Sequence, residues 1–231
     1  MKKILLIIAI ICAVTAHAQD DFTPLKQSTF NFEKGAFHEL RCSVPVSVTY
    51  TVTDSVAPSV SPIGLNVYVD CVDVRVENNT LFLNLNLPDY MNTPGANELQ
   101  INIIGPALTK VEADGKCFLV TIGNQTSDSQ MEVYASDGAN IMLRDHIKAS
   151  QVSASASDGS VIGFFTVNTP RMNVRATDMS IINIYSPPSE SGTSHVGKLE
   201  LHASRLSTVT VSNTTYDSVT EDKDDESKIK L

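Results

Sequence analysis

The stretch Met131–Leu143 reads MEVYASDGANIML, and phrases of the same form recur through the second half of the chain. They are VSASASDGSVIGF (152–164), MNVRATDMSIINI (172–184) and LELHASRLSTVTV (199–211), with a looser copy, VEADGKCFLV, at 111–120. Neighbouring copies lie about 20 to 27 residues apart. A fixed period of this size predicts one structural unit that is stacked repeatedly on itself.

Within each copy, apolar and polar residues alternate up to a central Asp or Arg. The apolar sets are Met131/Val133/Ala135, Val152/Ala154/Ala156, Met172/Val174/Ala176 and Leu199/Leu201/Ala203. The alternation resumes after the centre, for example at Ile141 and Leu143. Because successive side chains of a strand point to opposite faces, this pattern predicts half-buried strands. Each copy is therefore interpreted as strand, tight corner and strand.

The corner reads Ser-Asp-Gly in two copies, where Gly138 and Gly159 can adopt positive φ without steric cost. The Asp of each corner can hydrogen-bond its own backbone. Met179 and Leu206 replace the glycine in the next two copies. We therefore predict that positive φ is not required at those two corners. The remaining residues of each period, such as 146–151, would form a third side and return the chain to its start.

Equivalent residues of such a stack lie above one another, about 4.8 Å apart. One column would hold Ala135, Ala156, Ala176 and Ala203, and another would hold Ile141, Ile162, Ile182 and Val209. The predicted fold class is all-β, a right-handed parallel β-helix or β-solenoid with an N-terminal strand-rich cap. The alternative is a β-sandwich of short hairpins, although hairpins do not need the same residue at the same place in every copy.

The chain divides into four predicted parts. They are a signal peptide (1–18), a flexible leader (19–29), a β-solenoid domain (30–212) and an acidic disordered tail (213–231). Within the solenoid domain, 30–105 would supply starting and capping strands and 106–212 the repeated layers. Asn78-Asn79, between two strand-like runs, predicts a hairpin turn. Residues 186–197, with two prolines and two glycines, are interpreted as an insertion.

The N-terminus MKKILLIIAIICAVTAHAQ has two lysines, an apolar run and an Ala-His-Ala sequence before Gln19. This arrangement predicts export with cleavage after Ala18, to the periplasm, the outer surface or the medium. The alternatives are an uncleaved anchor or a lipoprotein at Cys12. No integral membrane segment is expected after cleavage. Removal of 1–18 leaves 15 basic and 26 acidic residues, a net charge of −11, which disfavours nucleic acid as a partner.

Three cysteines remain after the predicted cleavage, Cys42, Cys71 and Cys117. An odd number cannot pair completely within one chain. A disulfide between Cys42 and Cys71 is one interpretation, and three small buried hydrophobic residues are the other.

The pattern of strands and corners resembles a bacterial exported family, the auto-transporter adhesins of the head-GIN type, whose function is unknown. The resemblance lies in FHELRCSVPVSVTY (37–50), VENNTLFLNL (76–85), LQINIIGPALTKVEADGKCFLV (99–120) and the Asp-Gly corners. It covers roughly residues 30–212 and is specific for fold rather than chemistry. The chain departs from it at Met179 and Leu206, where the corner glycine is missing.

Asp114, Asp137, Asp158 and Asp178 are predicted to line one corner of successive layers. Such a ladder of carboxylates is a candidate Ca²⁺ site, since Ca²⁺ prefers oxygen ligands, but each layer supplies only one. We expect the Asp side chains to cap their own corners instead, with no metal. A lyase interpretation would use Arg144, Arg171, Arg175 or Arg205 as the base. No catalytic or cofactor-binding residues are predicted, because no nucleophile elbow, P-loop, HExxH or CxxC is present.

The sequence therefore favours a non-enzymatic exported solenoid that presents a flat face to an envelope or extracellular protein or to a glycan. The alternatives are a carbohydrate-active enzyme of the polysaccharide-lyase type and a purely structural envelope protein. The eight Phe and six Tyr are scattered in the sequence and predict no platform for stacking on sugars.

Overall fold

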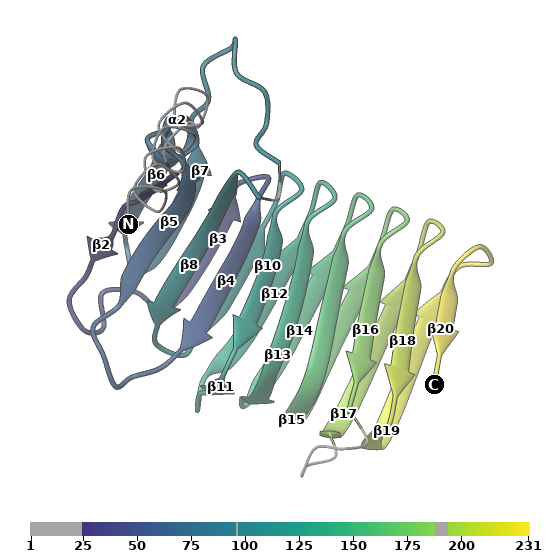
Figure 1. Cartoon of the computed structure of the whole chain (residues 1–231). Coiled ribbons are helices and arrows are strands. Elements are labelled where there is room, and N and C mark those ends of the chain that lie inside the picture. Colours follow the sequence, from purple (N-terminus) through teal and green to yellow (C-terminus); the bar gives the residue numbers. More distant parts are fainter. Residues whose placement is uncertain (1–24, 96, 188–193) are drawn as a thin grey trace, which may run out of the picture.

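A computed structural model describes residues 25–95, 97–187 and 194–231, and the signal peptide predicted at 1–18 lies outside them. The protein is all-β and dominated by one extended sheet, with a single short helix, α2 (Asn66–Val69), among the described residues. Figure 1 shows the strands side by side along one axis, with tight corners at one edge and longer connections at the other.

Strands on one side of the stack form what we call the front ladder. In spatial order they are β5 (Ser59–Leu65), β8 (Leu99–Gly105), β4 (Ser47–Val52), β10 (Phe118–Ile122), the start of β13 (Asn140–Lys148), the start of β15 (Val161–Ala176), β16 (Ile181–Tyr185), β18 (Thr208–Ser212) and β20 (Lys228–Lys230). From β8 onward every pairing in the front ladder is parallel.

The opposite side is the back ladder. It runs through β6 (Val72–Glu77), β7 (Thr80–Leu85), β3 (Glu39–Ser43), β9 (Lys110–Ala113), β12 (Gln130–Ala135), β14 (Gln151–Ala156), the end of β15, β17 (Ser194–Ala203) and β19 (Thr214–Lys223). A narrower floor joins the two ladders. It contains β11 (Asn124–Thr126) and the parts of β13, β15, β17 and β19 that pair with it in succession.

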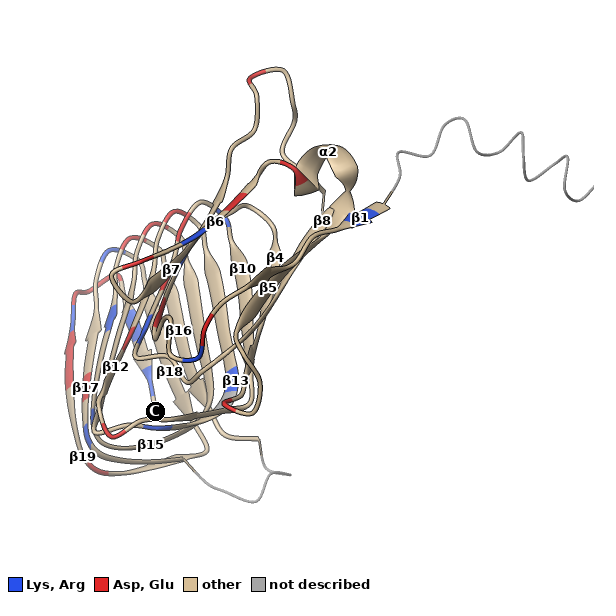
Figure 2. Cartoon of the chain, turned by 90° about the vertical axis from the view of Figure 1, so that its left-hand side faces the viewer, with Lys and Arg blue, Asp and Glu red and all other residues tan. Residues whose placement is uncertain are grey.

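The first strands differ from the rest, because β5 and β8 pair antiparallel and β6 and β7 form an antiparallel hairpin. Asn78 and Asn79 make its turn with φ of 49° and 67°, as the sequence predicted. β1 (Leu25–Gln27) and β2 (Phe30–Asn31) pair with β5. Among the described strands, those at this end do not pair with β19 or β20 at the other, so the sheet is open (Figure 2).

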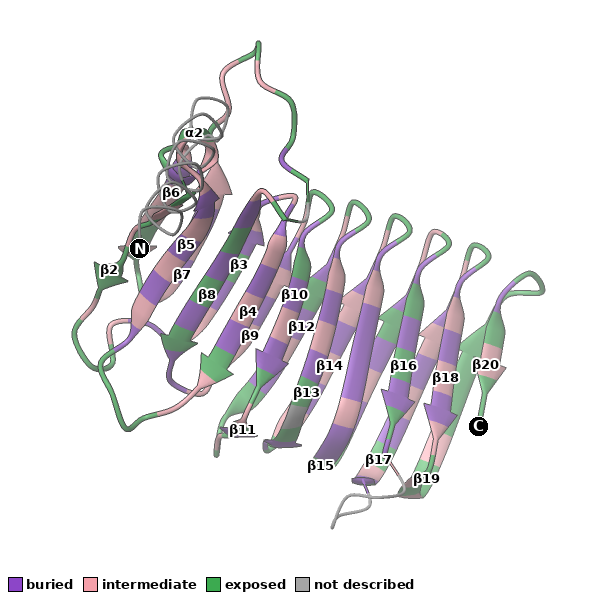
Figure 3. Cartoon of the chain, viewed as in Figure 1, coloured by how far each residue is buried: buried purple, intermediate pink, exposed green. Residues whose placement is uncertain are grey.

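The core lies between the two ladders and is built from columns of identical or similar side chains. Ala135, Ala156, Ala176 and Ala203 are buried in register, and Ala113 extends their column. Ile141, Ile162, Ile182 and Val209 form the second column, also fully buried. Both predicted columns are confirmed, and Figure 3 shows the resulting bands of burial crossing the front ladder.

At five successive corners, from the one after β9 to the one after β17, two neighbouring residues adopt positive φ. The pairs are Gly115–Lys116, Asp137–Gly138, Asp158–Gly159, Asp178–Met179 and Arg205–Leu206. The prediction that positive φ is not required at Met179 and Leu206 is therefore wrong, since both residues adopt it, with φ values of 61° and 65°. The cause is the stack itself. The N–H of Met179 donates to the carbonyl oxygen of Arg205 at 2.9 Å, as Gly159 donates to Asp178. This contact between corners fixes the conformation of Met179 whatever its side chain. At the next corner the N–H of Arg205 donates to Asp224 Oδ2 at 2.7 Å.

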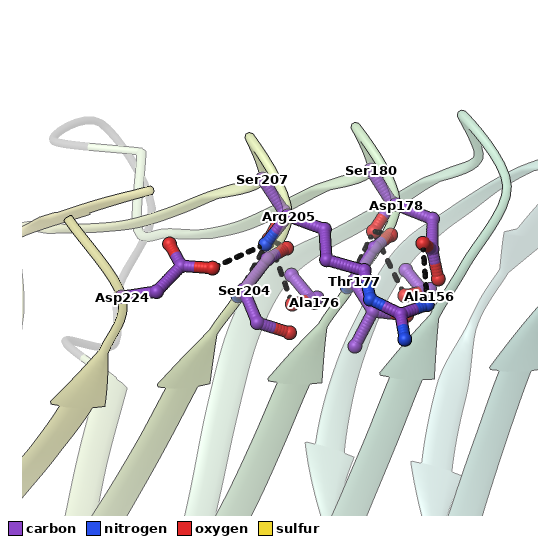
Figure 4. A network of polar contacts seen from close by, with 9 residues as sticks. All are labelled: Ala156, Ala176, Thr177, Asp178, Ser180, Ser204, Arg205, Ser207 and Asp224. Atoms are coloured by element: carbon purple, nitrogen blue, oxygen red, sulfur yellow. Dashed lines mark hydrogen bonds and ion pairs between the residues drawn. The ribbon is translucent and has the colours of Figure 1, made fainter. Parts of the chain in front are cut away.

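A column of buried serines closes the corners from inside, and the sequence analysis missed it. Ser160, Ser180 and Ser207 are almost fully inaccessible to solvent. The Oγ of Ser180 accepts the N–H of Thr177 at 3.0 Å. It also lies 2.6 Å from the carbonyl oxygen of Thr177 and 2.8 Å from that of Ala156 in the preceding layer. Figure 4 shows that Ser207 repeats this arrangement one layer on.

The predicted disordered tail at 213–231 is not what the structure shows. β19 pairs with β17 from Thr214 to Lys223, and β20 pairs with β18. The polar side chains of β19 are mostly exposed, and its backbone hydrogen bonds hold it in the ladder. The composition of 213–231 indicated disorder because this segment is poor in apolar residues. β19 is nevertheless ordered, because a strand at the end of the stack has only one face to pack against the core. The predicted leader likewise contains β1, and 188–193 of the predicted insertion lie outside the described residues.

The alanine column gives a test of the register. Ala156 is fully buried between Ala135 and Ala176. Ala156→Leu should overpack the column and lower the free energy of unfolding by roughly 1–3 kcal/mol. Urea denaturation of both proteins measures the difference. Ala57→Leu, at an exposed position, is the matched control and should change little. Equal stability of Ala156→Leu and wild type would show that the column is placed wrongly.

The left-handed corners give a second test. A non-glycine residue in this region costs roughly 1–2 kcal/mol, and glycine returns part of that through its greater freedom in the unfolded chain. Met179 is 66% exposed, so its side chain contributes little packing. Met179→Gly should therefore raise the free energy of unfolding by about 0.5–1 kcal/mol. Asn183→Gly, in the middle of β16, should lower it. Destabilisation by Met179→Gly would contradict the left-handed conformation.

Candidate binding surface

The outer surface of the front ladder carries large apolar side chains, which is unusual for a sheet face in contact with water. We call the following residues of β10, β13, β15 and β16 the apolar face: Phe118, Val120, Ile122, Met142, Val161, Phe165, Ile181 and Tyr185. Phe118, Ile122, Ile181 and Tyr185 remain 38–46% exposed. The others are partly buried. The strand registers place these residues on neighbouring strands. Val120 lies beside Met142. Phe165 follows Phe164 in the sequence, and Phe164 pairs with Ile184.

These strands are apolar on both faces. Residues 118–122 read FLVTI, 161–165 read VIGFF and 181–185 read IINIY. Nearly continuous apolar runs are typical of strands that are covered on both sides. Here the inner residues, such as Leu119 and Ile182, fill the core. The outer residues have no covering element among the described residues.

Contacts within the apolar face flatten it. A Cβ at Gly163 would lie 2.8 Å from the Sδ of Met142, so the glycine lets Met142 lie across the sheet. The rings of Phe165 and Tyr185 meet edge to face, with centroids 6.2 Å apart. The guanidinium of Arg144 lies 5.7 Å from the centroid of Phe165. The stack thus brings together two aromatic residues that are 20 positions apart in the sequence.

Charge is distributed unevenly between the two ladders. Figure 2 shows acidic and basic residues along the back ladder and the corners, whereas the front ladder is mostly uncharged. The charged residues on the outer side of the front ladder are Arg144, Lys228 and Lys230, among the described side chains. The corner carboxylates border the apolar face along one edge.

The back ladder presents a surface whose charges pair with each other. Lys110 Nζ lies 2.6 Å from Glu112 Oε1, and Arg41 Nε lies 3.8 Å from Glu112 Oε2. The hydrogen bond to Glu112 raises the pKa of Lys110 above its ordinary value. Lys110 also lies 5.5 Å from the ring centroid of Tyr134. Several charges of this surface are therefore paired with each other, whereas the front ladder presents mainly apolar side chains.

The four predicted corner carboxylates do not form one column. Asp137, Asp158 and Asp178 occupy equivalent positions, with φ of 54–55°. Asp114 lies one residue earlier, because Ala113 pairs with Ala135, and its carboxylate accepts the hydroxyl of Ser43 at 2.9 Å. The predicted capping role belongs to serine, since the Oγ of Ser160 accepts the N–H of Ser157 at 3.1 Å.

The carboxylate of Asp178 accepts a hydrogen bond from Arg205 Nη1 at 2.9 Å, as Figure 4 shows. This contact lowers the pKa of Asp178 and raises that of Arg205. Arg205 is thus engaged in an ion pair, while Arg144 lies at Phe165 and Arg171 and Arg175 lie on β15. Among the described residues, no group of three or more His, Cys, Asp or Glu is placed to hold a metal ion.

The three cysteines are free thiols. Cys42 and Cys117 are buried together, and the hydrogen bond between them, with burial, raises the pKa of Cys42 well above its ordinary value. Cys71 is partly exposed and donates to the carbonyl oxygen of Val67 at 3.2 Å. The thiol that accompanies Cys42 is thus Cys117 rather than Cys71.

Residues 36–215 match the family model described as "Putative auto-transporter adhesin, head GIN domain". The chain belongs to this family. The resemblance found in the sequence is thereby confirmed. A search of curated proteins found no match. In the described part of the chain, no helix has the length and apolar character needed to span a membrane.

Solved structures share the fold at low identity. A putative adhesin from Bacteroides fragilis is 14% identical with a TM-score of 0.59, over 89% of this chain and 96% of that chain. A putative adhesin from Parabacteroides merdae is 10% identical, with a TM-score of 0.53 over 89% and 95%. A putative lipid binding protein from Parabacteroides distasonis is 12% identical, with a TM-score of 0.52 over 89% and 96%. At these identities the likeness establishes the fold alone.

The corner carboxylates lead to a prediction about Ca²⁺. The ion needs six to eight oxygen ligands, whereas each corner offers one carboxylate and that of Asp178 is held by Arg205. Calorimetric titration should detect no micromolar Ca²⁺ binding. Asp158→Asn should change the free energy of unfolding by less than about 0.5 kcal/mol, like the control Asp54→Asn. Micromolar binding that disappears in Asp158→Asn alone would overturn this prediction.

Proposed function

We propose that this protein is an exported, non-enzymatic binding module that attaches to another macromolecule of the cell envelope or its surroundings through the apolar face. The observation that carries the proposal is the second apolar side of β10, β15 and β16, which no described element covers. The family description, an adhesin, agrees with attachment to an external partner.

The dimensions of the apolar face indicate the kind of contact. Four strands about 4.8 Å apart and five residues at about 3.3 Å give an area on the order of 300 Å². Patches of roughly 300–600 Å² are often functional on monomeric proteins. A standard interface buries about 800 Å² on each partner. The apolar face therefore fits the dry centre of an interface whose rim includes Arg144 and the neighbouring Asn and Thr side chains.

The proposal includes the architecture of the chain and its location in or outside the cell. In-register parallel pairing from β10 to β20 supports a right-handed β-solenoid that starts within 30–105 and repeats through 106–212. The N-terminal sequence supports removal of a signal peptide at 1–18 and delivery to the periplasm, the outer surface or the medium.

Two alternatives fit the observations less well. A polysaccharide lyase would need a free base beside metal-bound carboxylates, yet the arginine that meets a corner carboxylate, Arg205, forms an ion pair with Asp178 that raises its pKa and makes it a poorer base. A purely structural envelope protein would have no use for exposed Phe, Ile and Tyr side chains, which favour association.

Site-specific photocrosslinking tests the attachment. Tyr185 on the apolar face and Tyr134 on the back ladder are equally exposed, at 38% and 37%, and form a matched pair. Benzoylphenylalanine at position 185 should crosslink the partner in intact cells, and the same residue at position 134 should not. Ile181→Ser combined with Phe118→Ser should abolish the 185 crosslink without lowering the melting temperature. Crosslinks of equal yield from both positions would refute a role for the apolar face, as would persistence in the double variant.

A further inference from the structure

We propose a second binding site, a trough along the lower edge of the stack that accepts an extended, neutral, hydroxyl-rich oligosaccharide. The trough follows the line where the floor meets the back ladder. It is an open groove with a volume of about 820 Å³, lined from Ser127 in its first layer to Ser218 in its last. It does not include the apolar face, so each proposal stands or fails separately.

The trough crosses successive layers rather than following one strand. The floor has five layers here, and one residue of each layer pairs with its equivalent in the next. In order, these residues are Thr126, Lys148, Asn168, His195 and Thr215. At a spacing of about 4.8 Å, five layers span roughly 20 Å. Binding pockets for small ligands typically enclose about 300–1,000 Å³. The trough is therefore long and large enough for several sugar units laid along the stack.

The backbone keeps the trough hollow. Its bottom is formed by small residues, including Ala149 and Gly197. A Cβ at Gly197 would lie 2.6 Å from the carbonyl oxygen of Pro170. A side chain at this position cannot be accommodated without moving the neighbouring layer, so the hollow follows from the close approach of the two layers.

The rim combines charges of both signs with polar groups. Asp128, Lys148, Asn168, His195 and Asp217 line the floor side in successive layers. His195 is held in place, with Nδ1 3.0 Å from Thr215 Oγ1 and Nε2 3.6 Å from Asp217 Oδ1. Lys148 has no ion-pair partner within the described ranges. Donors and acceptors therefore line the trough along its full length.

The charges and polar groups that line the trough favour some classes of polymer over others. A polyanion would meet Asp128 and Asp217 near the two ends, and a polycation would meet Lys148 and Lys198 between them. An extended peptide usually adds to a free strand edge, but the trough crosses strands whose backbone groups already pair in the ladder. A hydroxyl both donates and accepts hydrogen bonds, so a neutral sugar chain can pair with every group on the rim.

Calorimetry with defined sugars tests the proposal on the mature chain. The neutral probes are cellohexaose and chitohexaose, each compared with its trisaccharide, and the acidic probe is hexagalacturonate. At least one neutral hexasaccharide should bind, its trisaccharide at least tenfold more weakly. Ser218→Trp should weaken that binding at least tenfold, because the indole fills the end of the trough. Thr220→Trp is the matched control, an exposed position two residues along the same strand, and should change affinity less than twofold.

Three results would overturn the proposal. They are no binding of either neutral hexasaccharide, tighter binding of hexagalacturonate, and equal losses in Ser218→Trp and Thr220→Trp. Each variant is checked by its melting temperature. If Ser218→Trp fails to fold, Ser150→Trp, at an exposed position in the middle layers of the trough, takes its place with the same expected tenfold loss.

Discussion

The hydrogen bond that links each corner to the next is the contact on which the rest of this structure depends. The N–H of the second corner residue donates to the carbonyl oxygen of the first residue in the following corner. The N···O distances are 2.9–3.0 Å for the pairs Gly138–Asp158, Gly159–Asp178 and Met179–Arg205. Each donor of this bond is the second of two successive residues with positive φ. It also fixes the parallel register on both sides of the corner, so that alanine lies on alanine and isoleucine on isoleucine. A slip by one residue would turn every inward side chain outward.

A fixed register makes the surface as periodic as the core. A side chain on the outer face of one strand lies beside its equivalent on the next, so surface features extend along the stack in rows. The apolar face and the edge trough are two such rows, and the paired charges of the back ladder are a third. Each of these rows is spread over several layers. Affinity should accordingly grow with the number of layers that a partner covers.

Much of this architecture could be predicted from the sequence, because the repeat and its alternation fix strands, corners and inward columns. Ser160, Ser180 and Ser207 could also have been found, since each follows the central corner residue by two positions. The apolar runs at 118–122 and 181–185 could have indicated strands with two apolar faces, but the sequence analysis interpreted the repeat strands as half-buried. The left-handed conformation of Met179 could not be predicted from residue type, because its hydrogen bond to the next layer imposes it. Asp114 was misaligned by one residue because its copy is the most divergent.

The last described layer shows how composition can mislead. Registers pair Leu201 with Glu221 and Ala203 with Lys223, so charged residues occupy positions that are apolar in every preceding layer from β12 onward. Tyr216, Val219 and Ile229 still cover the layer beneath. Inward-pointing charges on an edge strand discourage pairing with a further strand. The acidic residues that indicated disorder therefore act on an ordered strand: they protect an exposed edge from association, which leaves the long faces of the stack as the surfaces available to partners.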